Sequence, residues 1–158
     1  MAETLVLYFS RFGTTATLAN ALAKKLGASL ERVTPIASYA GAGGYLRGVW
    51  RALRREAAPI EPPGDLSRHA LAVVGAPAWA GRPSPPMRSL CGRFERIAAS
   101  RVSGGGAPDR AVGEEIERLV GKTFVATTAF SQREVDRGAA DAKLEDFASA
   151  LRASGIWR

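Results

Sequence analysis

The chain has very little of the chemistry on which most metal and nucleophile sites depend. Its 158 residues include one cysteine, Cys91, and one histidine, His69. A single cysteine excludes an internal disulfide, and neither residue belongs to a zinc-binding spacing. We expect Cys91 to be a buried structural thiol. We expect no catalytic role for His69, because it precedes a predicted strand at the amino end of the sheet.

Long apolar runs are absent too. No stretch approaches the roughly 18 apolar residues that a membrane-spanning helix needs. The first ten residues, MAETLVLYFS, carry an acidic residue where a secretion signal would carry lysines. The sequence therefore predicts a cytoplasmic protein without a membrane span.

Acidic residues are fewer than basic ones. The chain has 22 Lys and Arg against 15 Asp and Glu, which gives a formal net charge of +7. Such a charge attracts anions of many kinds. However, the sequence has no basic stripe interleaved with aromatic residues and no recognisable nucleic-acid-binding module. We expect most of the charge to be solvated surface, and we expect no nucleic-acid partner.

Strand patterns alternate with helix patterns along the chain. Short apolar runs predict strands at residues 4–9, 29–33, 70–75, 96–102 and 123–130. Apolar residues at helical spacing predict helices at 14–26, 45–55, 87–91, 108–120 and 133–153. Because neighbouring parallel strands need crossover helices, the alternation predicts an α/β fold. We expect a doubly wound, five-stranded parallel sheet in a single domain spanning residues 1–158.

The second predicted helix combines an apolar face with many arginines. Its apolar residues are Tyr45, Leu46, Val49, Trp50 and Leu53, and the arginines around them are Arg47, Arg51, Arg54 and Arg55. We expect the apolar face to pack on the sheet, as a crossover helix does. The alternative is a helix that binds a membrane surface or a partner protein.

The turn after the first strand is a candidate anion site. In an open parallel sheet, ligands bind beyond the carboxyl ends of the strands, where the strand order reverses. Residues Ser10 to Thr15, S-R-F-G-T-T, lead from the first strand into a helix. Their hydroxyls and the free N–H groups of the helix N-terminus are suited to hold an anion. The pattern leaves open that Ser10 or Thr14 only caps the helix.

Two more loops follow strands at the same edge of the sheet. Gly75 to Gly81, G-A-P-A-W-A-G, holds Trp79 in a stretch rich in proline and glycine. This indole can either stack on a planar ligand or pack over the end of the core. The S-G-G-G turn that begins at Ser103 offers backbone amides without large side chains.

Together these loops resemble those of the flavodoxin-like family, and the resemblance covers nearly the whole chain. The first resembles its phosphate loop, S/T-x-S/T-G-x-T, and the second its G-x-P-x-W/Y-x-G segment, whose aromatic residue stacks on the isoalloxazine ring. The third resembles its S-G-G turn. The resemblance implies the strand order 2-1-3-4-5, FMN as cofactor, and these FMN-binding residues: Ser10, Arg11, Phe12, Gly13, Thr14, Thr15, Pro77, Ala78, Trp79, Ala80, Gly81, Ser103, Gly104 and Gly105.

The sequence departs from the family pattern at two places. Phe12 stands where the family usually has a hydroxyl, which removes one hydrogen-bond donor to the phosphate. The S-G-G-G turn contains no aromatic residue, so Trp79 is the main stacking residue. Arg82, close to Trp79 in the sequence, is a candidate contact for the flavin edge or for a nicotinamide phosphate.

The resemblance implies an FMN-dependent oxidoreductase. It would take electrons from a reduced nicotinamide or a partner reductase and pass them to a quinone or a similar small-molecule acceptor. Hydride transfer to a flavin needs no acidic or basic side chain, so no catalytic residue is assigned. The positive net charge favours this activity over a low-potential shuttle, because it raises the potential for the second electron. A non-catalytic electron carrier and a flavin-free binding domain remain alternatives, and a homodimer remains an option.

Overall fold

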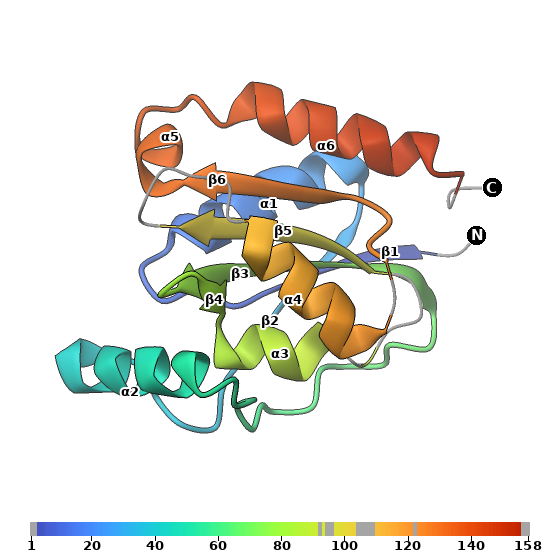
Figure 1. The fold of residues 1–158 in the computed structure, drawn as a ribbon. Coiled ribbons are helices and arrows are strands. Elements are labelled where there is room, and N and C mark those ends of the chain that lie inside the picture. Colours follow the sequence, from blue (N-terminus) through green and yellow to red (C-terminus); the bar gives the residue numbers. More distant parts are fainter. Residues whose placement is uncertain (1–2, 92, 94–96, 104–109, 122, 156–158) are drawn as a thin grey trace.

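The computed structural model describes residues 3–91, 93, 97–103, 110–121 and 123–155 (Figure 1). Its strands are β1 (Glu3–Tyr8), β2 (Ser29–Arg32), β3 (His69–Trp79), β4 (Arg82–Pro83), β5 (Ile97–Ser103) and β6 (Thr127–Ser131). Its helices are α1 (Thr14–Leu26), α2 (Gly41–Leu53), α3 (Pro85–Cys91), α4 (Arg110–Val120), α5 (Gln132–Asp136) and α6 (Asp141–Ala153). Among the described residues, no helix is both long enough and apolar enough to cross a membrane.

The central sheet has the strand order β2-β1-β3-β5-β6, and each neighbouring pair is parallel. The prediction of the α/β class is confirmed. The sequence predicted a five-stranded parallel sheet; the structure has these five parallel strands and, in addition, the two-residue strand β4, which pairs antiparallel with the end of β3. The chain reverses there at Ala80 and Gly81, whose φ angles are 51° and 69°. Two consecutive residues with positive φ are typical of a tight hairpin turn.

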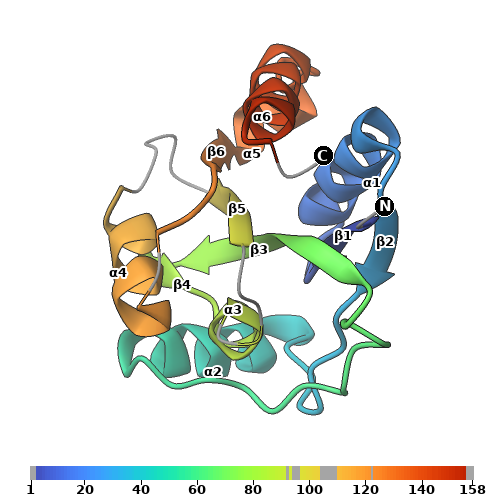
Figure 2. The ribbon, with the colours of Figure 1, turned by 90° about the vertical axis from the view of Figure 1, so that its right-hand side faces the viewer.

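Helices cover both faces of this sheet (Figure 2). One core cluster joins alternate strand residues such as Val6 and Val73 to α1 and α6. The strand residues between them, such as Leu7 and Val74, point to the other face and pack against α3 and α4. Cys91 is completely buried in this second cluster, and burial raises the pKa of its thiol to about 12. The prediction of a buried structural thiol is confirmed.

The final helical segment is two helices rather than one. Ser131 is the N-cap of α5, and its hydroxyl accepts a hydrogen bond from the backbone N–H of Glu134. The Glu134 carboxylate accepts one from the Ser131 N–H in return, which completes a capping box. Helix α5 ends at Asp136, and Gly138 then takes a positive φ of 68°, so the chain turns before α6 begins.

Helix α2 buries only part of its predicted apolar face: Val49 packs on the aromatic cluster and Tyr45 contacts Trp79. Its buried residues are Gly48 and Ala52, whereas Leu46 and Trp50 are 66% and 62% exposed. The reason is close approach: a Cβ on Gly44 would lie 2.6 Å from the carbonyl carbon of Tyr39. Small residues let the helix backbone pack closely against its neighbours, and Leu46, Trp50 and Leu53 point outward. Figure 1 shows α2 extending beyond the arrowheads of β3 and β5.

Candidate functional site

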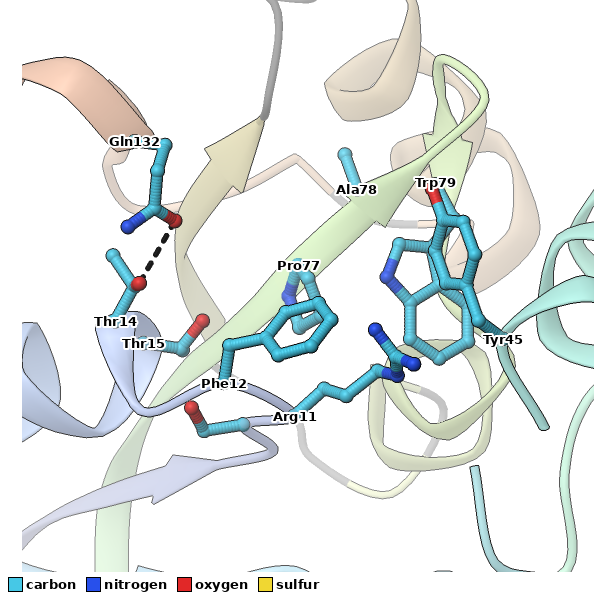
Figure 3. Close-up of a pocket in the computed structure, with 10 residues that line it drawn as sticks. Arg11, Phe12, Thr14, Thr15, Tyr45, Pro77, Ala78, Trp79 and Gln132 are labelled. Carbon is cyan, nitrogen blue, oxygen red and sulfur yellow. Dashed lines mark hydrogen bonds between the residues drawn. The ribbon is translucent and has the colours of Figure 1, made fainter. Parts of the chain in front are cut away.

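A cavity of about 460 Å³ lies beyond the carboxyl ends of β1 and β3 (Figure 3). Its volume is in the range of small-molecule sites, roughly 300–1,000 Å³. It is lined by Ser10, Arg11, Phe12, Thr14, Thr15, Tyr45, Pro77, Ala78, Trp79 and Gln132. The structure therefore brings together the turn after β1 and the end of β3, two of the three loops that the sequence singled out.

The turn after β1 leaves the start of α1 open. The N-cap residue is Gly13, with a φ of 95°, and no side chain caps the helix. The Ser10 hydroxyl accepts a hydrogen bond from the Gly13 N–H at 3.0 Å, and the Thr14 hydroxyl donates to the Gln132 side chain at 2.8 Å. Neither Ser10 nor Thr14 is therefore the N-cap of α1, although the Ser10 hydroxyl closes the turn at Gly13. The N–H groups of the first helical turn remain available for an anion.

Arg11 is held firmly beside the cavity. Its Nε donates to the Tyr39 carbonyl at 2.8 Å, and its Nη2 donates to the Gly41 carbonyl at 2.7 Å. Its guanidinium carbon lies 3.9 Å from the centre of the Phe12 ring and 4.8 Å from that of Tyr45. Within the described part of the chain, no salt bridge to a carboxylate neutralises it. Arg11 therefore places a fixed positive charge at the cavity wall.

Trp79 lines the cavity but is also part of a small aromatic core. Only 5% of its surface is exposed. Its ring makes edge-to-face contacts with Phe9, Tyr39 and Tyr45, with centroid separations of 5.8, 5.3 and 5.9 Å. Both readings of this residue thus have support: it packs over the end of the core, and it borders the cavity. These contacts hold the indole in one orientation.

Two lining residues were missed by the sequence reasoning, Tyr45 and Gln132. Tyr45 lies on α2, whose apolar residues were expected to face the sheet. Gln132 is the first residue of α5, and no motif marked the end of β6 as part of the site. The α5 capping box and an ion pair between Glu134 and Lys143 hold this helix in place. Hydrogen bonds from Lys143 and from the Ser131 backbone lower the pKa of Glu134 to about 2.

Several predicted residues lie outside the cavity lining. Ala80 and Gly81 form the turn between β3 and β4 and do not line it. Ser103 ends β5, in register with Ser131 of β6. Gly104 and Gly105 lie outside the described residues.

An arginine cluster on the neighbouring elements surrounds Glu115 of α4. Its carboxylate pairs with Arg88, with Arg82 at 3.2 Å and with Arg55 at 3.3 Å. Partial burial opposes the ionisation of Glu115, but the three guanidinium groups outweigh it and hold the pKa below its usual value. Arg82 is thus engaged by Glu115 and does not line the cavity. The ion pair between Arg82 and Glu115 connects the β3–β4 hairpin to α4.

Comparison with solved structures supports the fold; no family model and no curated protein sequence matches the chain. A flavoprotein from Lactobacillus acidophilus NCFM, crystallised in complex with FMN, is similar with a TM-score of 0.69 and 21% identity. The match covers 87% of this chain and 98% of that one.

Two other structures extend the comparison. An inferred flavoprotein from Bacteroides uniformis ATCC 8492 is similar with a TM-score of 0.71 and 18% identity, over 90% of this chain and 98% of that one. Oxidised flavodoxin 2 from Bacillus cereus is similar with a TM-score of 0.53 and 14% identity, over 96% and 99% of the two chains. The chain has a flavodoxin-like α/β fold.

Proposed function

We propose that this protein binds FMN in the cavity at the carboxyl ends of β1 and β3 and acts as an oxidoreductase. One observation carries the proposal: the cavity joins an uncapped helix N-terminus and three hydroxyl side chains to an aromatic wall, and its described lining residues include no carboxylate. A phosphate fits the polar end of such a site, and a planar ring fits the aromatic end. The similar flavoprotein from Lactobacillus acidophilus was crystallised with FMN, which supports the same ligand here.

The residues present fit both ends of FMN. Ser10, Thr14 and Thr15 would hold the phosphate, together with the backbone N–H groups that follow Gly13. Trp79 and Tyr45 would border the ring system. Phe12 is 77% exposed, so its ring lies outside the turn and leaves the backbone of the phosphate loop accessible.

Bound FMN supplies the redox chemistry, and the protein supplies position and charge. Arg11 is the one charged residue among the described residues that line the cavity. A fixed positive charge stabilises a bound flavin that has gained negative charge, and so raises the potential for the second electron. This supports electron transfer from a reduced nicotinamide or a partner reductase to a quinone-like acceptor, rather than a low-potential shuttle. Ser103, Gly104 and Gly105 are proposed to complete the site from the end of β5.

Reconstitution with FMN tests the proposal directly. We expect the protein to quench FMN fluorescence with a 1:1 endpoint and to melt at a higher temperature when FMN is in excess, because the ligand binds only the folded state. Riboflavin, which lacks the phosphate, is the matched ligand control and should bind more weakly. A protein that stays colourless and whose melting temperature ignores FMN would contradict the proposal.

The electron donor and acceptor need a second assay. A reductase should oxidise a reduced nicotinamide in the presence of a soluble quinone without any added protein. A non-catalytic carrier should bind FMN equally well but require a partner reductase for the same reaction. FMN binding without direct turnover would therefore favour the carrier and leave the cofactor proposal intact.

A further inference from the structure

We propose that the outward face of α2 binds an anionic lipid surface. This outer face consists of Leu46, Trp50 and Leu53, which are 66%, 62% and 48% exposed. Their spacing of four and three residues places them in one stripe along the helix. Exposed apolar side chains occur singly on most proteins, but a continuous stripe of this kind marks an interaction site.

The fold keeps this face exposed. At 3.6 residues per turn, Gly48 and Ala52 lie on the opposite side of the helix from the outer face, and both are buried. A Cβ on Gly48 would overlap the Trp79 ring, and one on Gly44 would overlap the Tyr39 backbone. At these two positions no larger side chain fits against the rest of the protein, so the close packing of Gly44 and Gly48 keeps the outer face turned away from it.

Positive charge borders the outer face along one flank. Each residue of the outer face is followed in the sequence by an arginine, which lies about 100° further around the helix. These arginines are Arg47, Arg51 and Arg54. From Gly41 to Arg55 the sequence contains no acidic residue. Glu56 pairs with Arg51 at 3.9 Å and with Arg54 at 2.8 Å. The three arginines of this flank are thus offset by one carboxylate, that of Glu56.

This arrangement matches a helix that lies in the plane of a membrane surface. In such helices the apolar stripe enters the acyl boundary, and basic side chains at its edge reach the headgroups. Each Lys or Arg near an anionic bilayer adds to the attraction. Among the described residues, the Arg47 guanidinium contacts the Ser38 carbonyl and the Tyr39 ring, and no described carboxylate pairs with it.

Other occupants fit this face less well. An antiparallel symmetric pair of copies meeting through their outer faces would bring the arginine flank of one helix beside that of the other, and like charges repel there. A stable protein partner needs about 800 Å² on each side, which spreads over 20 or more residues. Three apolar side chains on one helix supply a narrower surface.

Lipid binding does not depend on the proposed redox function, because the outer face and the cavity use different residues. The two are nevertheless close: Tyr45 lines the cavity and immediately precedes Leu46. A bilayer bound by α2 would therefore lie next to the cavity, where an acceptor that partitions into lipid would be concentrated.

Vesicle binding tests the proposal with the full chain. We expect the protein to sediment with phosphatidylcholine vesicles that contain phosphatidylglycerol and to do so much less with phosphatidylcholine alone. Added salt should weaken the binding. Leu46→Ser/Trp50→Ser/Leu53→Ser should reduce partitioning by about tenfold or more. These side chains are exposed, so the melting temperature and FMN affinity should not change.

A pair of charge variants separates local binding from the effect of net charge. Arg51→Gln/Arg54→Gln should weaken partitioning several-fold. Lys24→Gln/Arg68→Gln removes the same charge from exposed positions away from α2 and should have little effect. Equal losses in the two variants, or no binding to anionic vesicles, would overturn the proposal. So would a wild-type dimer that the triple serine variant converts to a monomer, because that result would assign the outer face to a second copy.

Discussion

The backbone of Gly48 in α2 packs directly on the indole of Trp79, so closely that a Cβ at this position would overlap ring atom Cζ3. The same Cβ would also come within 3.0 Å of the Tyr39 ring. This contact sets the rotation of α2, and it holds Trp79 at the wall of the cavity. The outward stripe on α2 and the aromatic wall of the cavity thus depend on one glycine.

Gly48→Ala should therefore destabilise the protein although alanine is the better helix former. The methyl group forces α2 or Trp79 to move, and overpacking of this kind costs about 1–3 kcal/mol. Urea unfolding measures the loss of stability, and near-UV circular dichroism should show a change in the Trp79 environment.

Gly43→Ala is the matched control on the same helix. Nothing lies within 4 Å of a Cβ at position 43, so only the helix propensity changes. We expect it to raise stability by up to about 1 kcal/mol. If both variants were stabilised equally, the close packing of α2 on Trp79 would be refuted.

Replacing Phe12 should tighten FMN binding. Phe12 occupies the position where flavodoxin-like proteins usually place a hydroxyl, and its ring is 77% exposed. Phe12→Thr restores a possible donor to the phosphate at little cost in burial. A net hydrogen bond to a charged group contributes about 1.5–3 kcal/mol, so we expect a Kd at least several-fold lower by fluorescence titration.

Ile36→Thr provides the control for Phe12→Thr. Ile36 is 69% exposed and does not line the cavity, so its replacement removes a comparable apolar surface without touching the phosphate loop. Its Kd for FMN should equal that of the wild type. An unchanged Kd in Phe12→Thr as well would argue against a phosphate at this turn.

The sequence predicted the parts of the fold and site that follow from local patterns. Apolar runs identified the strands, and the rule that ligands bind at the carboxyl ends of parallel strands pointed to the turn at Ser10 and to Trp79. These two features do meet at one cavity. Strand β3 proved longer than expected, because its pairing with β5 continues to Pro77 and the hairpin with β4 extends it to Trp79.

The features that the sequence did not predict depend on tertiary packing, which a local sequence pattern does not specify. Helix α2 carries a large apolar face and a small-residue face, and periodicity favours burying the larger one. The close packing of Gly44 and Gly48 instead places the small-residue face against the rest of the protein. Tyr45 and Gln132 reached the cavity through the placement of whole helices, so no local motif could have revealed them.

Removal of the charge on Arg11 should lower the flavin potential. Arg11 is anchored by two backbone carbonyls and two aromatic rings, and no described carboxylate offsets it. In Arg11→Gln we expect the potential for the second electron to fall by an amount on the order of tens of millivolts. Redox titration of the FMN complex measures this shift.

Arg68→Gln is the control for net charge. Arg68 is exposed, does not line the cavity and pairs with Asp65 at 3.9 Å, so its removal changes the total charge without changing the site. Salt screening should make its effect on the potential negligible. Equal shifts in both variants would show that net charge, and not Arg11, sets the potential.

Glu115→Gln should destabilise the protein at neutral pH. Glu115 is the partner of Arg88, whose side chain is 3% exposed and whose Nε has no hydrogen-bond partner in the described structure. Loss of the carboxylate leaves a buried guanidinium without its counter-charge. Breaking a buried ion pair costs about 3–5 kcal/mol of unfolding free energy. Because Glu115 is partly exposed, we expect Glu115→Gln to lose about 2 kcal/mol. Glu61→Gln, at an exposed position, should cost much less.

The dependence of this loss on pH distinguishes charge from packing. The pKa of Glu115 lies below its ordinary value of 4.5 in the folded protein, so its ionised form stabilises the fold. That contribution is fully present above the unfolded pKa and is lost as the pH falls through the lower folded pKa. The gap in unfolding free energy between wild type and Glu115→Gln should therefore be constant near neutrality and should narrow below about pH 4.5. A gap that stays constant into strong acid would mean that Glu115 acts through packing and not through its charge on Arg88.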